Sequence, residues 1–192
     1  MVLSWQNLVG GSASIILLLL IVPYIKTVMV GTTRPSAVSW IGWALLFAIE
    51  TAAQASKGLS WSLAIPLIST CSTTIIAITA LRMGRVVWTR ADYFCITLAA
   101  AAVMLWALTS EPLFALVLSI VADLAVTIPS VIKTYHEPDS EPFFLWAIYT
   151  GACVLAVVAT SPLTIYNLLV PVYTILGSLA IVVFARGRTS FK

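Results

Sequence analysis

Two carboxylates, Asp123 and Glu50, lie inside long apolar stretches of this 192-residue chain. A charged side chain at the centre of a bilayer costs at least about 2.5 to 3.5 kcal/mol, so such a residue usually faces a cavity or a partner. A carboxyl group in a cavity can exchange a proton or hold a cationic group. The chemistry that these two residues predict is therefore solute binding or coupling.

Asp123 belongs to a polar stripe at helical spacing. Ser119, Thr127 and Ser130 stand four residues before it, four after it and seven after it, which places all four on one face of a helix. This face predicts the wall of a cavity. The alternative is that Asp123 joins two helices, either protonated or hydrogen-bonded to a neighbour.

Glu50 shares a helical face with Trp43, Gln54 and Lys57. One interpretation is that Glu50 and Gln54 contribute to the binding site. The other is that Glu50 extends outward and is solvated or paired near Lys57.

Other polar and aromatic residues complete the predicted site. Asn167, Pro171, Thr174 and Ser178 share one face of the last apolar stretch. Tyr149 and Trp146 can stack on a ligand, or they can belong to an aromatic belt at the membrane interface. The predicted residues for binding or coupling are Asp123, Glu50, Ser119, Thr127, Asn167, Gln54 and Tyr149.

The groups that catalysis needs are missing from the pattern. The single histidine, His136, lies in the acidic stretch 136–141 and cannot act as a base within the apolar segments. The sequence contains no Gly-rich phosphate loop, nucleophile elbow or Cys/His metal cluster. We expect no catalytic residue, no metal site and no cofactor, and therefore no enzyme. Cys71, Cys95 and Cys153 are expected to be small packing residues.

The composition indicates an all-α integral membrane protein. Hydrophobic residues make up 61% of the chain, charged residues only 9%, and the mean hydropathy is +1.07. Helices satisfy their own backbone groups in lipid, and each needs roughly 20 apolar residues to cross the hydrocarbon. Seven segments meet this condition: 12–30, 37–56, 61–82, 91–109, 112–132, 142–160 and 163–186.

The distribution of basic residues predicts the orientation. If the N-terminus is outside, nine of the ten Lys and Arg residues lie on the cytoplasmic side and only Lys57 lies outside. The net charge of +3 is explained by this retention signal, so no nucleic-acid partner is expected. We expect a bacterial-type plasma membrane, with the lipid bilayer and a small-molecule solute as partners. Homo-oligomer formation stays open.

A signature occurs twice in the chain. Ile25-Lys26-Thr27 follows Pro23, and Ile132-Lys133-Thr134 follows Pro129, 106 residues after the first proline. Trp40 and Trp146 are also 106 residues apart, and Pro66 and Pro171 are 105 apart. The two predicted units are 12–85 and 112–188, joined by a linker helix at 91–109. Because a single linker helix reverses the chain once, the two three-helix repeats are expected to be parallel.

This 3+1+3 pattern, with a proline in the first helix of each unit, resembles the SWEET and PQ-loop families over residues 12–186. The chain lacks the Pro-Gln pair of the latter, since Tyr24 and Ser130 follow the two prolines. The resemblance implies a transporter or facilitator of a small polar solute, sugar-like or cationic, that works by alternating access, with proton-linked transport as one form. The alternative is a receptor-like or structural membrane protein without transport activity.

The prolines of both units are candidate hinges. A proline inside a helix removes one backbone hydrogen bond and weakens the helix at that point. The predicted hinges are Pro23, Pro129, Pro66 and Pro171. The alternative is that they are packing features only.

Overall fold

Helices account for all the regular structure in the computed structural model, which describes residues 4–31, 37–83, 90–136 and 138–186. Within these ranges there is no strand, so the predicted all-α class is confirmed. The α-helices are α1 (Trp5–Leu19), α2 (Ile21–Val30), α3 (Ala37–Ala55), α4 (Ala64–Arg82), α5 (Arg90–Thr109), α6 (Pro112–His136), α7 (Phe143–Val158) and α8 (Ile165–Arg186). Two short 3-10 helices are η1 (Trp61–Leu63) and η2 (Pro138–Ser140).

Three helical stretches are long and apolar enough to cross a membrane: Trp5–Val30, Trp61–Arg82 and Ile165–Ala185. Their outward faces carry large apolar side chains, among them Leu19, Val22, Ile78 and Val183, which are each between 46% and 64% exposed. Helices that are apolar on their outer face as well as inside are typical of a membrane environment. The structure thus contains helices that are long and apolar enough to span a membrane, as the sequence predicted, and the layout of seven spans stays a prediction.

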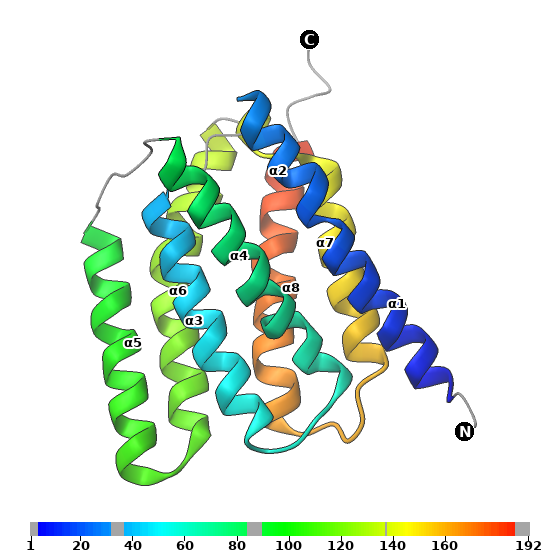
Figure 1. The fold of residues 1–192 in the computed structure, drawn as a ribbon, viewed down its shortest axis with the longest axis vertical. Coiled ribbons are helices and arrows are strands. Elements are labelled where there is room, and N and C mark those ends of the chain that lie inside the picture. The colour runs from blue at the N-terminus through cyan, green and yellow to red at the C-terminus, as the bar shows by residue number, and fades with distance from the viewer. Residues whose placement is uncertain (1–3, 32–36, 84–89, 137, 187–192) are drawn as a thin grey trace.

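Six helical units form a closed ring, and α5 lies outside it (Figure 1). Following the ring, the stretch α1–α2 packs on α4, α4 on α3, α3 on α6, α6 on α8, α8 on α7, and α7 on α1. Helix α5 packs on α6 and, less extensively, on α3. The ring is the scaffold that positions the candidate site.

The first helical stretch differs from the predicted segment at 12–30. It begins at Trp5, because Ser4 caps it: the Ser4 Oγ accepts a hydrogen bond from the Asn7 backbone N–H at 3.3 Å. The stretch is then interrupted at Leu20, between α1 and α2. Pro23 follows three residues later, and without an N–H group it cannot bond to the Leu19 carbonyl. The interruption therefore coincides with the turn that Pro23 weakens.

The other three prolines lie within continuous helices. Pro66 is the third residue of α4, where no intrahelical partner for its missing N–H is needed. Pro171 lies inside α8, and Pro129 lies inside α6, where only its backbone is described.

Two apolar clusters hold the ring together toward the end at which α1 begins. One cluster joins α3, α6 and α8 and contains Leu46, Ile49, Ala53, Ala115, Leu116, Ala122 and Val170. The other joins α1, α4 and α7 and contains Ala13, Leu17, Ile65, Ile68, Ala152, Cys153 and Ala156. Many of these side chains are alanine, so the helices approach closely without a polar contact.

We predict that Gly10→Ala destabilises the protein. A Cβ atom at Gly10 would overlap the Trp61 ring of η1, and overpacking of this kind costs about 1 to 3 kcal/mol. The measurement is the thermal unfolding midpoint in detergent. Gly11→Ala is the matched control, because a Cβ there meets nothing within 4 Å, and it should leave the midpoint unchanged or raise it. Equal midpoints for the two variants would contradict the close Gly10–Trp61 contact.

Candidate functional site

A pocket of about 140 Å³ lies at the centre of the ring. All six ring units contribute to its wall, and α5 contributes no described residue. The lining residues are Leu17, Leu20, Ile21 and Tyr24 from the first stretch; Trp40, Trp43 and Phe47 from α3; Ile68, Ser69, Ser72, Thr73 and Ile76 from α4; Asp123 and Thr127 from α6; Leu145, Trp146 and Tyr149 from α7; and Tyr173, Thr174, Gly177, Ser178 and Ile181 from α8.

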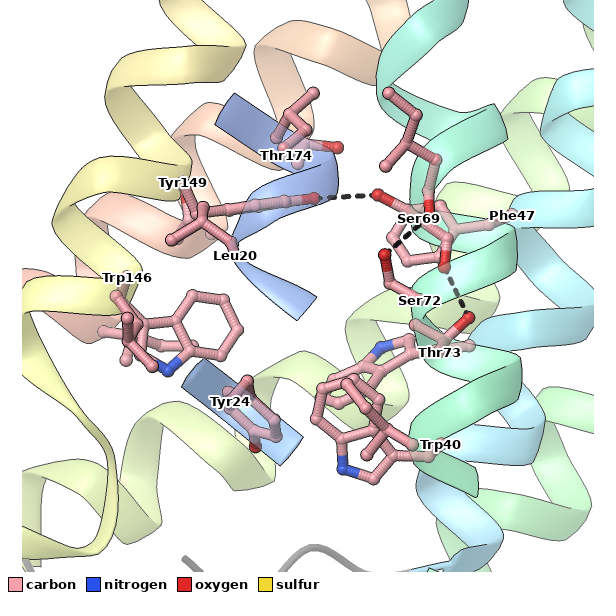
Figure 2. Close-up of a pocket in the computed structure, with 18 of the residues that line it drawn as sticks. Leu20, Tyr24, Trp40, Phe47, Ser69, Ser72, Thr73, Trp146, Tyr149 and Thr174 are labelled. Atoms are coloured by element: carbon pink, nitrogen blue, oxygen red, sulfur yellow. Dashed lines mark hydrogen bonds between the residues drawn. The ribbon is translucent and has the colours of Figure 1, made fainter. Parts of the chain in front are cut away.

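Aromatic rings form much of this wall. Trp40 packs against Tyr24, with ring centroids 5.2 Å apart, and edge-to-face against Trp43 at 5.1 Å. On the other side, Trp146 packs edge-to-face against Tyr149 at 5.9 Å. Figure 2 shows the rings of Tyr24, Trp40 and Trp146 at one end of the pocket. Aromatic faces of this kind bind apolar groups and cations.

One hydrogen bond crosses the pocket between α4 and α7. The Ser69 Oγ and the Tyr149 hydroxyl are 3.1 Å apart (Figure 2). The remaining hydroxyls of α4 bond back to their own helix, as expected for so many on one helix: Ser72 to the Ile68 carbonyl and Thr73 to the Ser69 carbonyl, both at 2.7 Å. Ser69 is thus the α4 hydroxyl that reaches across the pocket to another helix.

Asp123 places a carboxyl group in this wall. Its side chain is only 6% exposed, and the polar groups of Trp43, Thr127 and Tyr173 lie around it in the pocket wall. The Tyr173 hydroxyl donates its proton to the Thr127 Oγ1 at 3.1 Å. One carboxyl oxygen, Oδ1, is buried with no partner. The same is true of the Thr174 Oγ1 in the pocket wall, so two polar atoms at this site can still bind a ligand.

Glu50 and Ser119 lie behind the pocket and do not line it. Glu50 is 1% exposed and Ser119 is fully buried, where α3 packs against α6. The structure therefore places Glu50 inside the protein and away from the outer surface near Lys57. The Lys57 ammonium lies 5.0 Å from the centre of the Tyr166 ring instead.

Gln54 and Asn167 belong to a hydrogen-bond network toward the end where α1 begins. The Gln54 Nε2 donates to the Ser62 Oγ at 2.7 Å, and the Ser60 Oγ lies 2.8 Å from the same atom. Ser60 in turn donates to the Asn167 Oδ1 at 3.2 Å, and the Asn167 Nδ2 donates to the Pro162 carbonyl at 2.9 Å. This network connects α3, η1 and α8 and stands apart from the pocket.

The seven predicted site residues thus divide into three groups. Asp123, Thr127 and Tyr149 line the pocket, Glu50 and Ser119 lie behind it, and the remaining two lie in the network. The sequence interpretation did not include Trp40, Tyr24 or Tyr173 in the site. The repeated Trp40–Trp146 spacing was a usable signal for Trp40, whereas the two tyrosines had no signal that distinguishes them from lipid-facing aromatic residues.

The chain matches no protein-family model, no curated protein and no solved structure. The function of the pocket therefore has to be argued from its own residues.

We predict that Ser69 and Tyr149 stabilise each other across the pocket. A double-mutant cycle with Ser69→Ala, Tyr149→Phe and the double variant should give a coupling free energy of about 0.5 to 1.5 kcal/mol. The measurement is the unfolding free energy of the three variants and the wild type in detergent. Ser72→Ala, which removes a hydroxyl bonded only to its own helix, is the control partner for Tyr149→Phe. Coupling as large with Ser72 as with Ser69 would contradict this hydrogen bond.

Proposed function

We propose that this chain is an integral membrane protein that moves a small solute bearing a cationic group through the central pocket by alternating access. In this proposal the chain crosses the bilayer seven times, with α1 and α2 forming one broken span. Two parallel units, α1–α4 and α6–α8, are joined by the linker α5. The observation that carries the proposal is the buried Asp123 carboxyl group, with an unpartnered oxygen, in a pocket that all six helical units of the ring build.

The packing of the helices supports the two-unit arrangement. In the first unit the third helix, α4, packs on both α1 and α3, and in the second unit α8 packs on both α6 and α7. The units meet mainly through two contacts, α1 with α7 and α3 with α6. Exchanging the units turns one of these contacts into the other, as expected for two parallel repeats related by a twofold axis along the membrane normal.

The pocket wall repeats at the same spacing as the proline signature. Trp40 and Trp146 are 106 residues apart, and so are Trp43 and Tyr149. The five lining residues of α4 are each followed 105 residues later by a lining residue of α8. These pairs are Ile68 and Tyr173, Ser69 and Thr174, Ser72 and Gly177, Thr73 and Ser178, and Ile76 and Ile181. A pocket between two equivalent units is the expected site for a solute in this architecture. The arrangement favours membership of the SWEET and PQ-loop families, which the duplicated signatures resemble.

The differences between the two halves favour a cationic solute. At the positions equivalent to Asp123, Thr127 and Tyr173, the first unit has Leu17, Ile21 and Ile68. One side of the pocket therefore offers a carboxyl group and hydroxyls, and the other side offers aliphatic groups; the indoles of both units add aromatic faces. A small amine with an apolar body matches this wall, since the carboxylate and the aromatic faces attract its charge.

The position of the pocket supports alternating access. The lining residues of α3 and α7, among them Trp40 and Trp146, lie near the starts of these helices, on the side of the bundle where α4 ends at Arg82, and two apolar clusters and the Asn167 network fill the opposite end. A third apolar cluster, which contains Tyr24 and Val28, packs at the basic end. If the basic end is cytoplasmic, as the charge distribution indicates, the pocket lies between packed layers on both sides and nearer to the cytoplasmic surface. The proposed location is a bacterial-type plasma membrane with the N-terminus outside.

We predict that Asp123→Asn reduces uptake of small amines by proteoliposomes. The substitution keeps the size of the side chain but removes the charge, and a hydrogen bond to a charged group contributes about 1.5 to 3 kcal/mol. The apparent affinity should fall about 10- to 100-fold, and any dependence of uptake on a proton gradient should disappear. The measurement is uptake at several pH values with equal amounts of inserted protein.

Glu111→Gln is the matched control for Asp123→Asn, because Glu111 is exposed just before α6 and its carboxyl group accepts a long hydrogen bond from the Tyr166 hydroxyl, at 3.4 Å, away from the pocket. Identical uptake by wild type and Asp123→Asn would remove Asp123 from the site. Specific binding of an amine without any uptake would favour the receptor-like alternative. If the protein neither binds nor takes up any amine, the result would favour a structural protein.

We also predict that Pro23→Ala lowers the uptake rate more than the affinity. Alanine restores the N–H group that can bond to the Leu19 carbonyl and so joins α1 to α2, which stiffens the stretch that must bend. Pro129→Ala should act in the same direction, because the second proline occupies the equivalent place in α6. Pro66→Ala is the control, since that proline lies in the first turn of α4. Unchanged rates for Pro23→Ala and Pro129→Ala would reduce both prolines to packing residues.

A further inference from the structure

The contact between α3 and α6 buries four side-chain oxygen atoms that have no hydrogen-bond partner. They are the Glu50 Oε2, Gln54 Oε1, Ser119 Oγ and Asp123 Oδ1 atoms, and each residue is at most 6% exposed. A buried polar atom without a partner costs about 1 to 3 kcal/mol, and more when it is charged. Gln54 lies one turn beyond Glu50, in the Ser62 network. The other three, Glu50, Ser119 and Asp123, lie around one helix contact and point to a ligand that binds oxygen.

The four residues form two pairs on facing helices. Glu50 and Gln54 are one turn apart on α3, and Ser119 and Asp123 are one turn apart on α6. Leu46 and Ala53 of α3, on either side of Glu50, pack in the same cluster as Leu116 and Ala122 of α6, on either side of Ser119. The two carboxyl groups are also close enough for an electrostatic interaction. The oxygens therefore come from both sides of one seam.

The other contact between the two proposed units shows that polar residues are not needed here for packing. At the positions equivalent to Glu50, Ser119 and Asp123, the α1–α7 contact has Ala156, Ala13 and Leu17, all buried in one apolar cluster. The same kind of helix contact thus closes with small and aliphatic side chains alone. An interhelical bonding role for Glu50 and Ser119 is further disfavoured because neither of their unpartnered oxygens reaches a donor.

The protein supplies no cation at the seam. No described Lys, Arg or His side chain pairs with Glu50 or Asp123, and the Lys57 ammonium lies over the Tyr166 ring. A buried carboxyl group carries a stable negative charge only when a cation binds beside it. Carboxylate, amide carbonyl and hydroxyl oxygens are together the ligands that hard metal cations prefer.

We infer that Glu50 and Ser119, together with Asp123 at the boundary with the solute pocket, form a site for a monovalent metal cation, Na⁺, behind the wall of that pocket. The charge of the cation follows from the proposed function, which assigns the Asp123 charge to the solute and leaves Glu50 as the anionic ligand of the metal. Within the described residues no group of three His, Cys, Asp or Glu side chains could hold a metal. A site with so few anionic ligands suits a monovalent ion better than a divalent one. The sequence did not predict a separate cation site, because Glu50, Gln54, Ser119 and Asp123 were all assigned to a single site for solute binding or coupling.

The test is the thermal unfolding midpoint of the purified protein in detergent, followed by the fluorescence of its seven tryptophans. NaCl replaces choline chloride at constant ionic strength and pH. Sodium at about ten times its dissociation constant should raise the midpoint by roughly 3 to 6 °C, and above the dissociation constant the midpoint should keep rising with the logarithm of the Na⁺ concentration. Glu50→Gln should abolish the rise, Ser119→Ala should shift it to higher Na⁺ concentrations, and the control Glu111→Gln should keep it.

Direct ²²Na⁺ binding to the wild-type protein, expected at one ion per chain, keeps the test decisive if Glu50→Gln does not fold. The inference is overturned if the wild type binds no Na⁺, if Glu50→Gln keeps the full Na⁺ response, or if Ca²⁺ or acidification stabilises the protein while Na⁺ does not. Because neither measurement depends on transport, a failure of the Na⁺ site and a failure of solute uptake are distinguishable.

Discussion

A carboxyl group inside an apolar bundle has to be solvated by the protein itself, and the candidate site follows from this constraint. The polar groups around Asp123 come from three helices: Trp43 from α3, Thr127 from its own helix α6, and Tyr173 from α8. They can converge only if α6 packs between α3 and α8, which is the order of these helices in the ring. The burial of one acidic residue and the order of three helices are therefore mutually dependent.

The ring is closed mainly by small residues. Alanines at positions 13, 53, 115, 152 and 156 are at most 1% exposed and lie where α1 meets α7 and where α3 meets α6. Small side chains let helix backbones approach closely, and in lipid this packing replaces the hydrophobic driving force. The larger tryptophan and tyrosine side chains are concentrated around the pocket instead. The alanine contacts bring the helices together toward the end at which α1 begins. The bulky aromatic side chains keep the helices further apart around the pocket.

The sequence predicted the helices better than it predicted the site. Long apolar stretches separated by short polar connections are sufficient to locate the helices, and the position of Asp123 in a cavity wall follows from polar residues at spacings of four. The start of α1 at Trp5 was missed, although Ser4 three residues before Asn7 was a readable capping signal. The separation of Glu50 from the pocket was not predictable, because the rotation of α3 about its axis depends on how α4 and α6 pack against it. Spacing within one helix defines a face, but only packing between helices decides what that face meets.

The place of α5 outside the ring has a consequence for how the two proposed units can differ. If two identical copies of one unit assembled as a dimer, every residue would occur twice, and a single acidic residue on the axis would bring a second one opposite it. Covalent tethering by α5 removes this requirement, because each half can then mutate alone while the connection keeps the effective concentration of its partner high. Leu17 facing the pocket from one half and Asp123 from the other is an outcome that a fused chain can reach and a dimer of identical units cannot. Helix α5 contributes no described residue to the pocket. As the tether between the two proposed units, it nevertheless allows the two sides of the pocket to differ.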